Sequence, residues 1–258
     1  ALWRRLTWHR DAPISEPADI AVFRLAELAR RSVTVVLSGE GSDEMFGGYP
    51  KHRFAKVSSL AGVLPARLRS AMQAAIEQSL PPAATRLRIA LRALAESDET
   101  SRFRGWFSPF TTAERRALLT GGGHHPDACW LQESAEDALR RMLLIDMQSW
   151  LPDNLLERGD RMSMAASLEL RPPFLDRRML ELAFSLPSRL KVHKGTSKWL
   201  IKQVALRYLP ESIVKRRKVG FRVPLDAWFR DGLEAFAWDS LTSQASFAST
   251  VFDRTMVR

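Results

Sequence analysis

The stretch VVLSGEGSDEMFGGYPKHR, residues 35–53, contains four glycines and three carboxylates directly behind an apolar run. The run VTVVL (33–37) is rich in β-branched residues and does not alternate with polar ones, which predicts a strand covered on both faces. A helix predicted over residues 18–31 precedes it, so the order is helix, strand and glycine turn, as in an α/β fold. Ligands in such folds bind beyond the carboxyl ends of the strands, so the turn beginning at Ser38 is a candidate binding site.

The composition of this turn predicts a site for a metal-bound nucleotide. Gly39 and Gly41 permit backbone conformations that other residues avoid, and consecutive N–H groups in such turns bind anions. Glu40, Asp43 and Glu44 would repel phosphates unless a divalent cation lay between them. Mg²⁺ takes one or two carboxylates together with phosphate oxygens. The alternative is a glycine-rich turn with exposed acids, because short motifs often match by chance.

The chain beyond residue 60 is predicted to be mostly helical. A strong helix is expected over residues 135–150, with Ser134 and Asp137 in a near capping-box arrangement at its start. Its buried stripe would comprise Leu139, Met142, Leu143 and Met147.

Proline stops and helix caps divide the chain after residue 150. Pro172 and Pro173 are expected to end a preceding helix, and Asp176 to cap the next one. A further helix is predicted within GTSKWLIKQVALRYL (195–209), capped by Thr196 or Ser197. Its inward-facing residues would be Leu200, Ile201, Val204 and Tyr208.

Lys198 would lie in the first turn of that last helix. A cation there opposes the helix dipole at a cost of about 0.3–1 kcal/mol. A negatively charged group such as a phosphate would compensate, and a lysine that points to solvent explains the position equally well.

A second group of charges lies in RGDRMSMAASLELRPPFLD (158–176), where charged and apolar residues alternate. Such mixtures indicate a partly buried ion-pair network, and the sequence leaves open whether it orders a pocket or only the fold. The five charged residues in question are Asp160, Arg161, Glu169, Arg171 and Asp176.

The composition limits the class of protein. The chain has 258 residues, a formal net charge of +10 and one cysteine, Cys129, which excludes an internal disulfide framework and fits a reducing compartment. We find no apolar stretch of membrane-spanning length, so we expect a cytoplasmic protein without a membrane partner. The basic residues are scattered at helical spacing and form no recognisable recognition module, so we expect no nucleic-acid partner.

Four stretches together resemble the synthetase domain of glutamine-dependent asparagine synthetases. They are LSGEGSDEMFGGYPKHR, LPDNLLERGDRMSMAASLELRPPFLD, GTSKWLIK and VKRRKVGFRVPLDAWF, in the family's order and approximate spacing. The resemblance implies a nucleotide alpha-hydrolase-like (ATP pyrophosphatase) α/β domain with a large helical half. We expect residues 1–258 to form part of this ATP-binding domain, truncated at both ends.

The resemblance implies an ATP-dependent ligase that makes asparagine from aspartate and ammonia, the ammonia coming from glutamine. The side-chain carboxylate of aspartate attacks the α-phosphorus of ATP, and ammonia attacks the resulting β-aspartyl adenylate. Ser38 and Gly39 match backbone contacts to the nucleotide, and Glu40 matches an acid needed to form the adenylate that could also act as base toward ammonia. Asp43 matches a Mg²⁺ ligand. Lys198 matches a nucleotide-binding lysine that neutralises charge on the α-phosphate.

Two parts of the family pattern have no counterpart in this sequence. The nucleotide loop Ser-Gly-Gly-x-Asp-Ser is missing, because TGGGHHP (120–126) lacks its aspartate and serine, and the glutaminase domain is also expected to be absent. We therefore expect little or no activity from the isolated chain. A separate chain that carries both parts is a candidate partner, and a homodimer is compatible with the pattern.

Two alternatives remain open. Relatives with this architecture form other amides, including lactams and peptide-derived rings, through the same kind of acyl adenylate, and others are amidotransferases. Glu40 favours the ammonia-using branch, because cyclising relatives need no base for external ammonia. The second alternative is a non-catalytic partner subunit.

Overall fold

The computed structural model describes residues 2–11, 16–81, 84–120, 137–216 and 223–257. The chain divides into two compact units. Unit 1 comprises Ala1–Lys56 and Glu133–Val223, and unit 2 comprises Val57–Gln132 and Pro224–Arg258. Every candidate site residue from the sequence belongs to unit 1.

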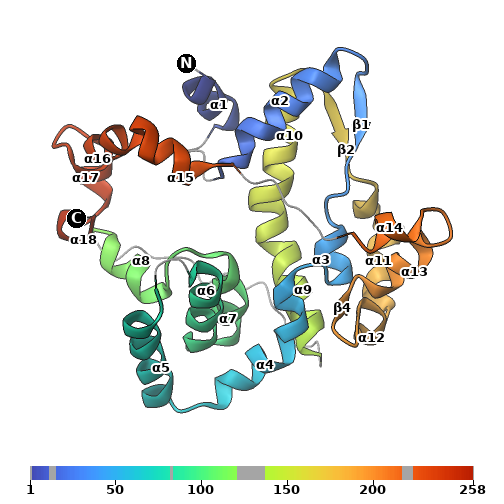
Figure 1. The fold of residues 1–258 in the computed structure, drawn as a ribbon, viewed down its shortest axis with the longest axis horizontal. Coiled ribbons are helices and arrows are strands. Elements are labelled where there is room, and N and C mark those ends of the chain that lie inside the picture. The colour runs from blue at the N-terminus through green and yellow to red at the C-terminus, as the bar shows by residue number, and fades with distance from the viewer. Residues whose placement is uncertain (1, 12–15, 82–83, 121–136, 217–222, 258) are drawn as a thin grey trace. The chain divides into compact units, whose positions relative to one another are not determined.

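Unit 1 combines many helices with two short sheets, so the predicted mostly helical α/β architecture is confirmed for the described residues (Figure 1). Its first segment contains α1 (Leu2–Arg10), α2 (Ala18–Arg30), β1 (Val35–Leu37), α3 (Ser42–Phe46) and η1 (Pro50–Phe54). Its second segment contains α9 (Ala138–Gln148), η5 (Leu151–Leu156), α10 (Glu157–Met164), β2 (Glu169–Arg171), η6 (Pro173–Leu175), α11 (Arg177–Ser185), α12 (Ser188–Lys191), β3 (Val192–His193), β4 (Thr196–Ser197), α13 (Trp199–Ala205) and α14 (Glu211–Val214).

The strand before the candidate site is shorter and more exposed than predicted. β1 begins at Val35, and its parallel partner β2, which the sequence analysis missed, lies beside it in Figure 1. Val35 is 38% exposed and Leu37 is 74% exposed. Side chains alternate across a strand, so these two residues lie on one face, and that face is open in the described part of the chain. The prediction that both faces are covered is therefore wrong.

The helix before β1 is confirmed at almost the predicted limits, and it packs against α1 and α10. Leu6, Phe23 and Met162 are fully buried where these three helices meet. The inward face of α2 centres on Phe23, whereas Leu25 is 54% exposed. α2 thereby fixes the position at which the chain enters β1.

The predicted helix over residues 135–150 is confirmed as α9, which begins at Ala138. Asp137 caps it, because its carboxylate accepts a hydrogen bond from the Leu139 N–H at 2.8 Å. The other predicted capping residue, Ser134, lies outside the described residues. The predicted stripe faces the core: Leu139, Met142 and Leu143 are buried, and Met147 packs against a cluster of Met45, Phe46 and Ala183.

The segment after α10 differs from the prediction. Pro172 and Pro173 end a strand and not a helix, because α10 stops at Met164 and β2 intervenes. Proline has no N–H to donate to a neighbouring strand, so it can end a strand such as β2 as well as a helix. Asp176 caps α11 as predicted, since its carboxylate accepts from the Arg178 N–H at 2.9 Å.

Unit 2 is helical apart from an isolated bridge between Leu119 and Phe252 in its described residues. None of the helices in the described ranges of the chain is both long enough and apolar enough to cross a bilayer. The elements are α4 (Ala55–Leu60), which begins in unit 1, η2 (Ala61–Val63), α5 (Ala66–Ser79), α6 (Thr85–Ala95), α7 (Glu99–Arg104), η4 (Gly105–Phe107), α8 (Thr112–Leu118), α15 (Leu225–Trp228), η7 (Phe229–Leu233), α16 (Glu234–Thr242), α17 (Ala248–Val251) and α18 (Arg254–Val257).

Candidate functional site

The site loop, defined as residues 38–48, continues from the carboxyl end of β1. The Ser38 N–H donates to the Arg171 carbonyl at 2.9 Å, so this amide is used within the β1–β2 pair. Gly41 has φ +85°, and a Cβ there would lie 2.3 Å from Cδ2 of Leu175, so the turn requires glycine. Gly39 is exposed, and a Cβ added to it would meet no atom within 4 Å. The open backbone at Gly39 is therefore the part of the turn that a ligand can approach.

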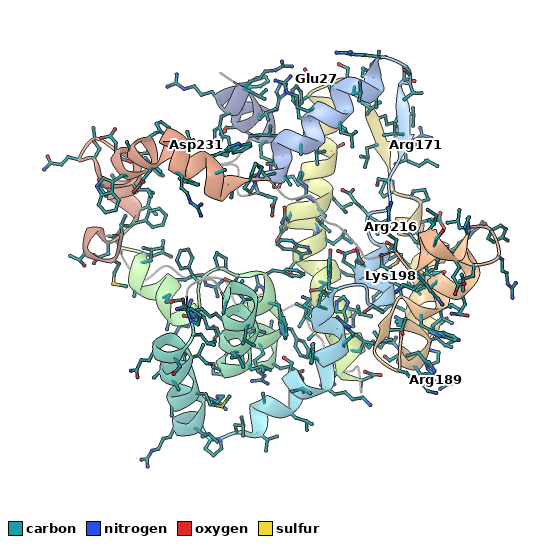
Figure 2. All side chains as sticks on the ribbon, viewed as in Figure 1. Glu27, Arg171, Arg189, Lys198, Arg216 and Asp231 are labelled. Atoms are coloured by element: carbon teal, nitrogen blue, oxygen red, sulfur yellow. The ribbon has the colours of Figure 1, made fainter. Side chains whose placement is uncertain are left out.

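Lys198 lies directly against the site loop, although 156 residues separate it from Ser42 along the chain (Figure 2). Its Nζ donates to Ser42 Oγ at 2.7 Å and lies 2.8 Å from Asp43 Oδ1. Gly48 leaves the space for this pair, because a Cβ there would lie 1.7 Å from Asp43 Oδ1 and 2.4 Å from Lys198 Cε. The fold therefore brings Asp43 and Lys198 together at the end of β1.

A hairpin delivers Lys198 to this position. β3 and β4 pair antiparallel around a turn in which Lys194 has φ 45° and Gly195 has φ 76°. Thr196 and Ser197 form β4, so the prediction that one of them caps the helix is wrong; Lys198 occupies the cap position in the left-handed conformation, with φ 52°. That conformation costs a non-glycine residue about 1–2 kcal/mol. The ion pair with Asp43 offsets part of that cost. The sequence left open a negative partner or a lysine that points to solvent, and the structure shows a negative partner.

The helix after Lys198 is also shorter and less buried than predicted. It ends at Ala205, and of the four predicted inward residues, Val204 is 46% exposed and Tyr208 is 80% exposed. Ile201 packs against the cluster of Met45, Phe46 and Ala183. α13 therefore reaches the core through its first turns only.

Glu40, from the same loop, packs against α10. A Cβ added to Gly159 would lie 2.9 Å from Glu40 Oε2 and 3.1 Å from Oε1. Oε2 is buried and has no hydrogen-bond partner among the described residues. Burial raises the pKa of Glu40; the positive charge of Arg158 opposes this shift and the negative charge of Glu44 adds to it.

A buried polar network connects the site loop to the core of unit 1. Glu44, which is 1% exposed, accepts a hydrogen bond from the Tyr49 hydroxyl. The Tyr49 N–H donates to His52 Nδ1 at 3.2 Å, so the proton of a neutral His52 ring lies on Nε2. That nitrogen lies 2.8 Å from Asp146 Oδ2 and donates to it. The network therefore links the site loop to α9.

Lys51 completes this network with an ion pair. Its Nζ lies 2.5 Å from Asp146 Oδ1, and the Lys51 and Asp146 side chains are 2% and 1% exposed. Burial lowers the pKa of Lys51 and of His52, and in both cases Asp146 opposes the shift. Burial also raises the pKa of Glu44, and its hydrogen bond with Tyr49 opposes that shift. Unit 1 thus holds several charges inside its core immediately beside the candidate site.

The charge cluster that the sequence did single out is not buried. Asp160, Arg161, Glu169, Arg171 and Asp176 are all exposed. Glu169 and Arg171 pair at 2.7 Å, with side chains 52% and 64% exposed. The predicted partly buried network is therefore wrong at these positions, because the helix and strand that carry them turn their polar faces to solvent.

Among the described residues, no group of three or more His, Cys, Asp and Glu side chains is placed to hold a metal ion. The site loop instead offers the Asp43 carboxylate, a hard oxygen donor, beside a cation. A single carboxylate fits Mg²⁺, which commonly takes its other ligands from phosphates and water.

Comparison with known proteins identifies the family. The asparagine synthase family model matches residues 1–258. The chain belongs to the asparagine synthase family. It is 33% identical over 254 residues to a putative glutamine-hydrolyzing asparagine synthetase of Mycobacterium bovis, covering 96% of this chain and 38% of that protein. It is 31% identical over 250 residues to glutamine-hydrolyzing asparagine synthetase 1 of Bacillus subtilis, covering 88% of this chain and 36% of that protein.

The chain therefore spans well under half of the length of these relatives. A more distant relative is amidase chry2 of Gibberella zeae, at 21% identity over 262 residues and 86% of this chain. Membership of the family agrees with the resemblance inferred from the sequence.

Sequence reasoning missed the groups that surround the site loop. Asp146 lies on the same helix face as the buried Met142 and Leu143, and an acid on an apolar stripe is a signal for a buried partner. Lys51 and His52 gave no such signal, because PKHR looks like an exposed basic turn. Gly159 could be found only from the structure, since its role depends on a side chain from another element.

Proposed function

We propose that this chain supplies the ATP-binding, amide-forming site of a ligase that converts aspartate to asparagine. The observation that carries the proposal is the contact between Asp43 and Lys198 at the carboxyl end of β1, with the open backbone of Gly39 in the same loop. Family membership supports the reaction class, and the α/β arrangement with its site beyond β1 supports assignment to the nucleotide alpha-hydrolase-like fold.

In the proposed mechanism Lys198 and Asp43 handle the phosphates. Mg²⁺ held by Asp43 would screen the charge of the ATP phosphates when bound. Lys198 would exchange its contact with Asp43 for the α-phosphate, whose charge grows as the aspartate carboxylate attacks and pyrophosphate leaves. Ser38 and Gly39 would position the nucleotide through backbone groups, with the Ser38 N–H excluded because the sheet uses it.

Glu40 would act in the second half of the reaction. Ammonia attacks the acyl carbon of β-aspartyl-AMP, AMP leaves, and the new ammonium group must lose a proton. Burial raises the pKa of Glu40, which makes its carboxylate a better proton acceptor than an exposed glutamate. The buried Oε2, which has no hydrogen-bond partner in the described part of the chain, is the atom we assign to accept it.

The test is ATP–pyrophosphate exchange in the presence of aspartate and Mg²⁺. The sequence contains no Ser-Gly-Gly-x-Asp-Ser loop, so we expect little exchange from the 258-residue chain and rapid exchange from a polypeptide that also carries that loop. Lys198→Ala and Asp43→Ala should each lower the exchange of that longer polypeptide by about 100-fold or more. Rapid exchange by the 258-residue chain would refute the expected inactivity, and unchanged exchange in both variants would refute the site.

A second acyl substrate is tested by the same assay. If the chain serves a lactam-forming or peptide-cyclising ligase, a panel of carboxylic acids will support exchange in place of aspartate. We favour aspartate with external ammonia, the ammonia supplied from glutamine by a glutaminase domain or partner chain, because Glu40 provides the base that ammonia requires.

A further inference from the structure

The carboxylate of Glu40 occupies a space that exists only because residue 159 has no side chain. Gly159 is the third residue of α10 and is buried. An ideal Cβ on Gly159 would lie 2.9 Å from Oε2, 3.1 Å from Oε1 and 3.4 Å from Cδ of Glu40. All three atoms belong to one carboxyl group, so the carboxyl group of Glu40 is the nearest neighbour of α10 at Gly159.

Nothing in the geometry of α10 itself requires a glycine at this position. Gly159 does not have a positive φ, and it lies inside a helix, where glycine is less favourable than alanine. In contrast, Gly41 and Gly47 both have positive φ values and are needed by the backbone. The need for glycine at position 159 therefore comes from the neighbouring carboxylate.

We propose that Gly159 is a positioning residue that sets the location of the Glu40 carboxylate for the amide-forming step. The proposal rests on the function assigned above to Glu40. The site loop brings Glu40 to α10 from the end of β1, and the bare backbone at Gly159 lets its carboxylate lie against the helix with Oε2 buried. Arg158, the preceding residue of α10, places a positive charge near the same carboxylate and helps to keep it ionised.

A methyl group at position 159 would displace the carboxylate without disturbing the fold. The atoms it meets are at the end of a flexible side chain, so Glu40 can swing away by rotating about its own bonds. Alanine is also more favourable than glycine inside a helix. Gly159→Ala is thus expected to leave the urea midpoint of unfolding equal to or above that of the unchanged chain while moving Glu40 toward solvent.

The position of Glu40 can be read without any catalytic assay. Carbodiimide coupling to a small amine, followed by peptide mass spectrometry, measures the exposure of individual carboxyl groups in the 258-residue chain. Glu181, whose side chain is 62% exposed, is the internal reference. We expect labelling of Glu40 relative to Glu181 to rise several-fold in Gly159→Ala and to stay unchanged in Met164→Ala, a control on the exposed face of the same helix.

Activity is measured in the polypeptide that is active in ATP–pyrophosphate exchange. Misplacing a reacting group by about 1 Å can cost about 100-fold in rate. We expect Gly159→Ala to lower kcat for ammonia-dependent amide formation at least tenfold while the KM for ATP stays unchanged, because Asp43 and Lys198 are untouched. Met164→Ala should keep both values.

The outcomes separate the proposal from the function beneath it. Increased labelling of Glu40 with reduced kcat and unchanged urea midpoint supports the positioning role. Unchanged labelling of Glu40 overturns the positioning role, and so does increased labelling with a normal kcat. A fall in urea midpoint together with increased labelling of many carboxyl groups would also overturn it, because it would show that Gly159 has only a structural role. If the unsubstituted polypeptide shows no exchange with any carboxylic acid, the proposed function fails, and with it the catalytic part of this inference, whatever the labelling shows.

Discussion

Replacing Asp146 by alanine should destabilise unit 1 strongly, because this carboxylate is the acceptor for two other buried polar groups. Lys51 Nζ lies 2.5 Å from Oδ1 and His52 Nε2 lies 2.8 Å from Oδ2. The three side chains are between 0% and 2% exposed, so water does not take the place of the lost carboxylate without rearrangement. The perturbation removes a charge from the protein interior while leaving its partners there.

The magnitude follows from the burial of the pair. Removing one member of a buried ion pair typically costs about 3–5 kcal/mol. Deprotonation of Lys51, whose pKa burial already lowers, keeps the loss from growing beyond this range. Asp146→Asn retains one acceptor oxygen but no charge, and we expect it to fall between the alanine variant and the unchanged chain.

Urea unfolding at pH 7, combined with hydrogen exchange of peptides from each unit, measures the effect. Exchange should accelerate in peptides from η1 and α9, which carry the network, and stay unchanged in peptides from α5 and α6 of unit 2. The matched control is Glu181→Ala, which removes a pair with Arg177 whose side chains are 62% and 90% exposed. Exposed pairs contribute about 0–1 kcal/mol. An Asp146→Ala variant no less stable than the control would refute the reasoning.

Three further predictions test other parts of unit 1. Gly48→Ala should lower ATP–pyrophosphate exchange of the active polypeptide by about 100-fold, because the new methyl would collide with Asp43 and Lys198; normal exchange would show that their contact is dispensable. Burial lowers the pKa of His52, so the unfolded chain takes up a proton at this residue before the folded chain does, and the stability that His52 contributes is complete above about pH 6.5 and declines as the pH falls. His52→Asn should therefore flatten the fall in urea midpoint between pH 7 and pH 5. A fall in urea midpoint as steep as that of the unchanged chain would contradict this. Asp19→Ala should lower the free energy of unfolding by about 3–5 kcal/mol, because Asp19 accepts two hydrogen bonds from the buried guanidinium of Arg10. An unfolding curve that matches that of the unchanged chain would contradict this.

The sequence predicted the local structure around the site loop. The apolar run before Ser38 and the glycines behind it correctly indicated a turn at the carboxyl end of a strand. The family resemblance selected Asp43 and Lys198, which the structure brings into contact. No spacing rule could have paired them, because such rules cover neighbouring turns of one element and these residues belong to segments far apart in the chain.

Other features depended on tertiary contacts that leave little trace in the sequence. β2 consists of only three residues, too few for a periodic pattern to appear. Lys198 is left-handed and its ammonium group contacts Asp43, and propensity at position 198 carries no sign of either feature. Asp146 alone gave a usable signal, as an acid on an apolar stripe.

Unit 1 is assembled from two separated segments of the chain, and this affects the order in which it can fold. Residues 57–132 are synthesised before the second segment, so Ala1–Lys56 is made before the helices and strand that pack against it. Closing so long a loop costs entropy that only the completed core repays, and such long-range contacts form slowly. The cation that faces Asp43 belongs to the second segment, so the contact between Asp43 and Lys198 can form only after that segment has been made.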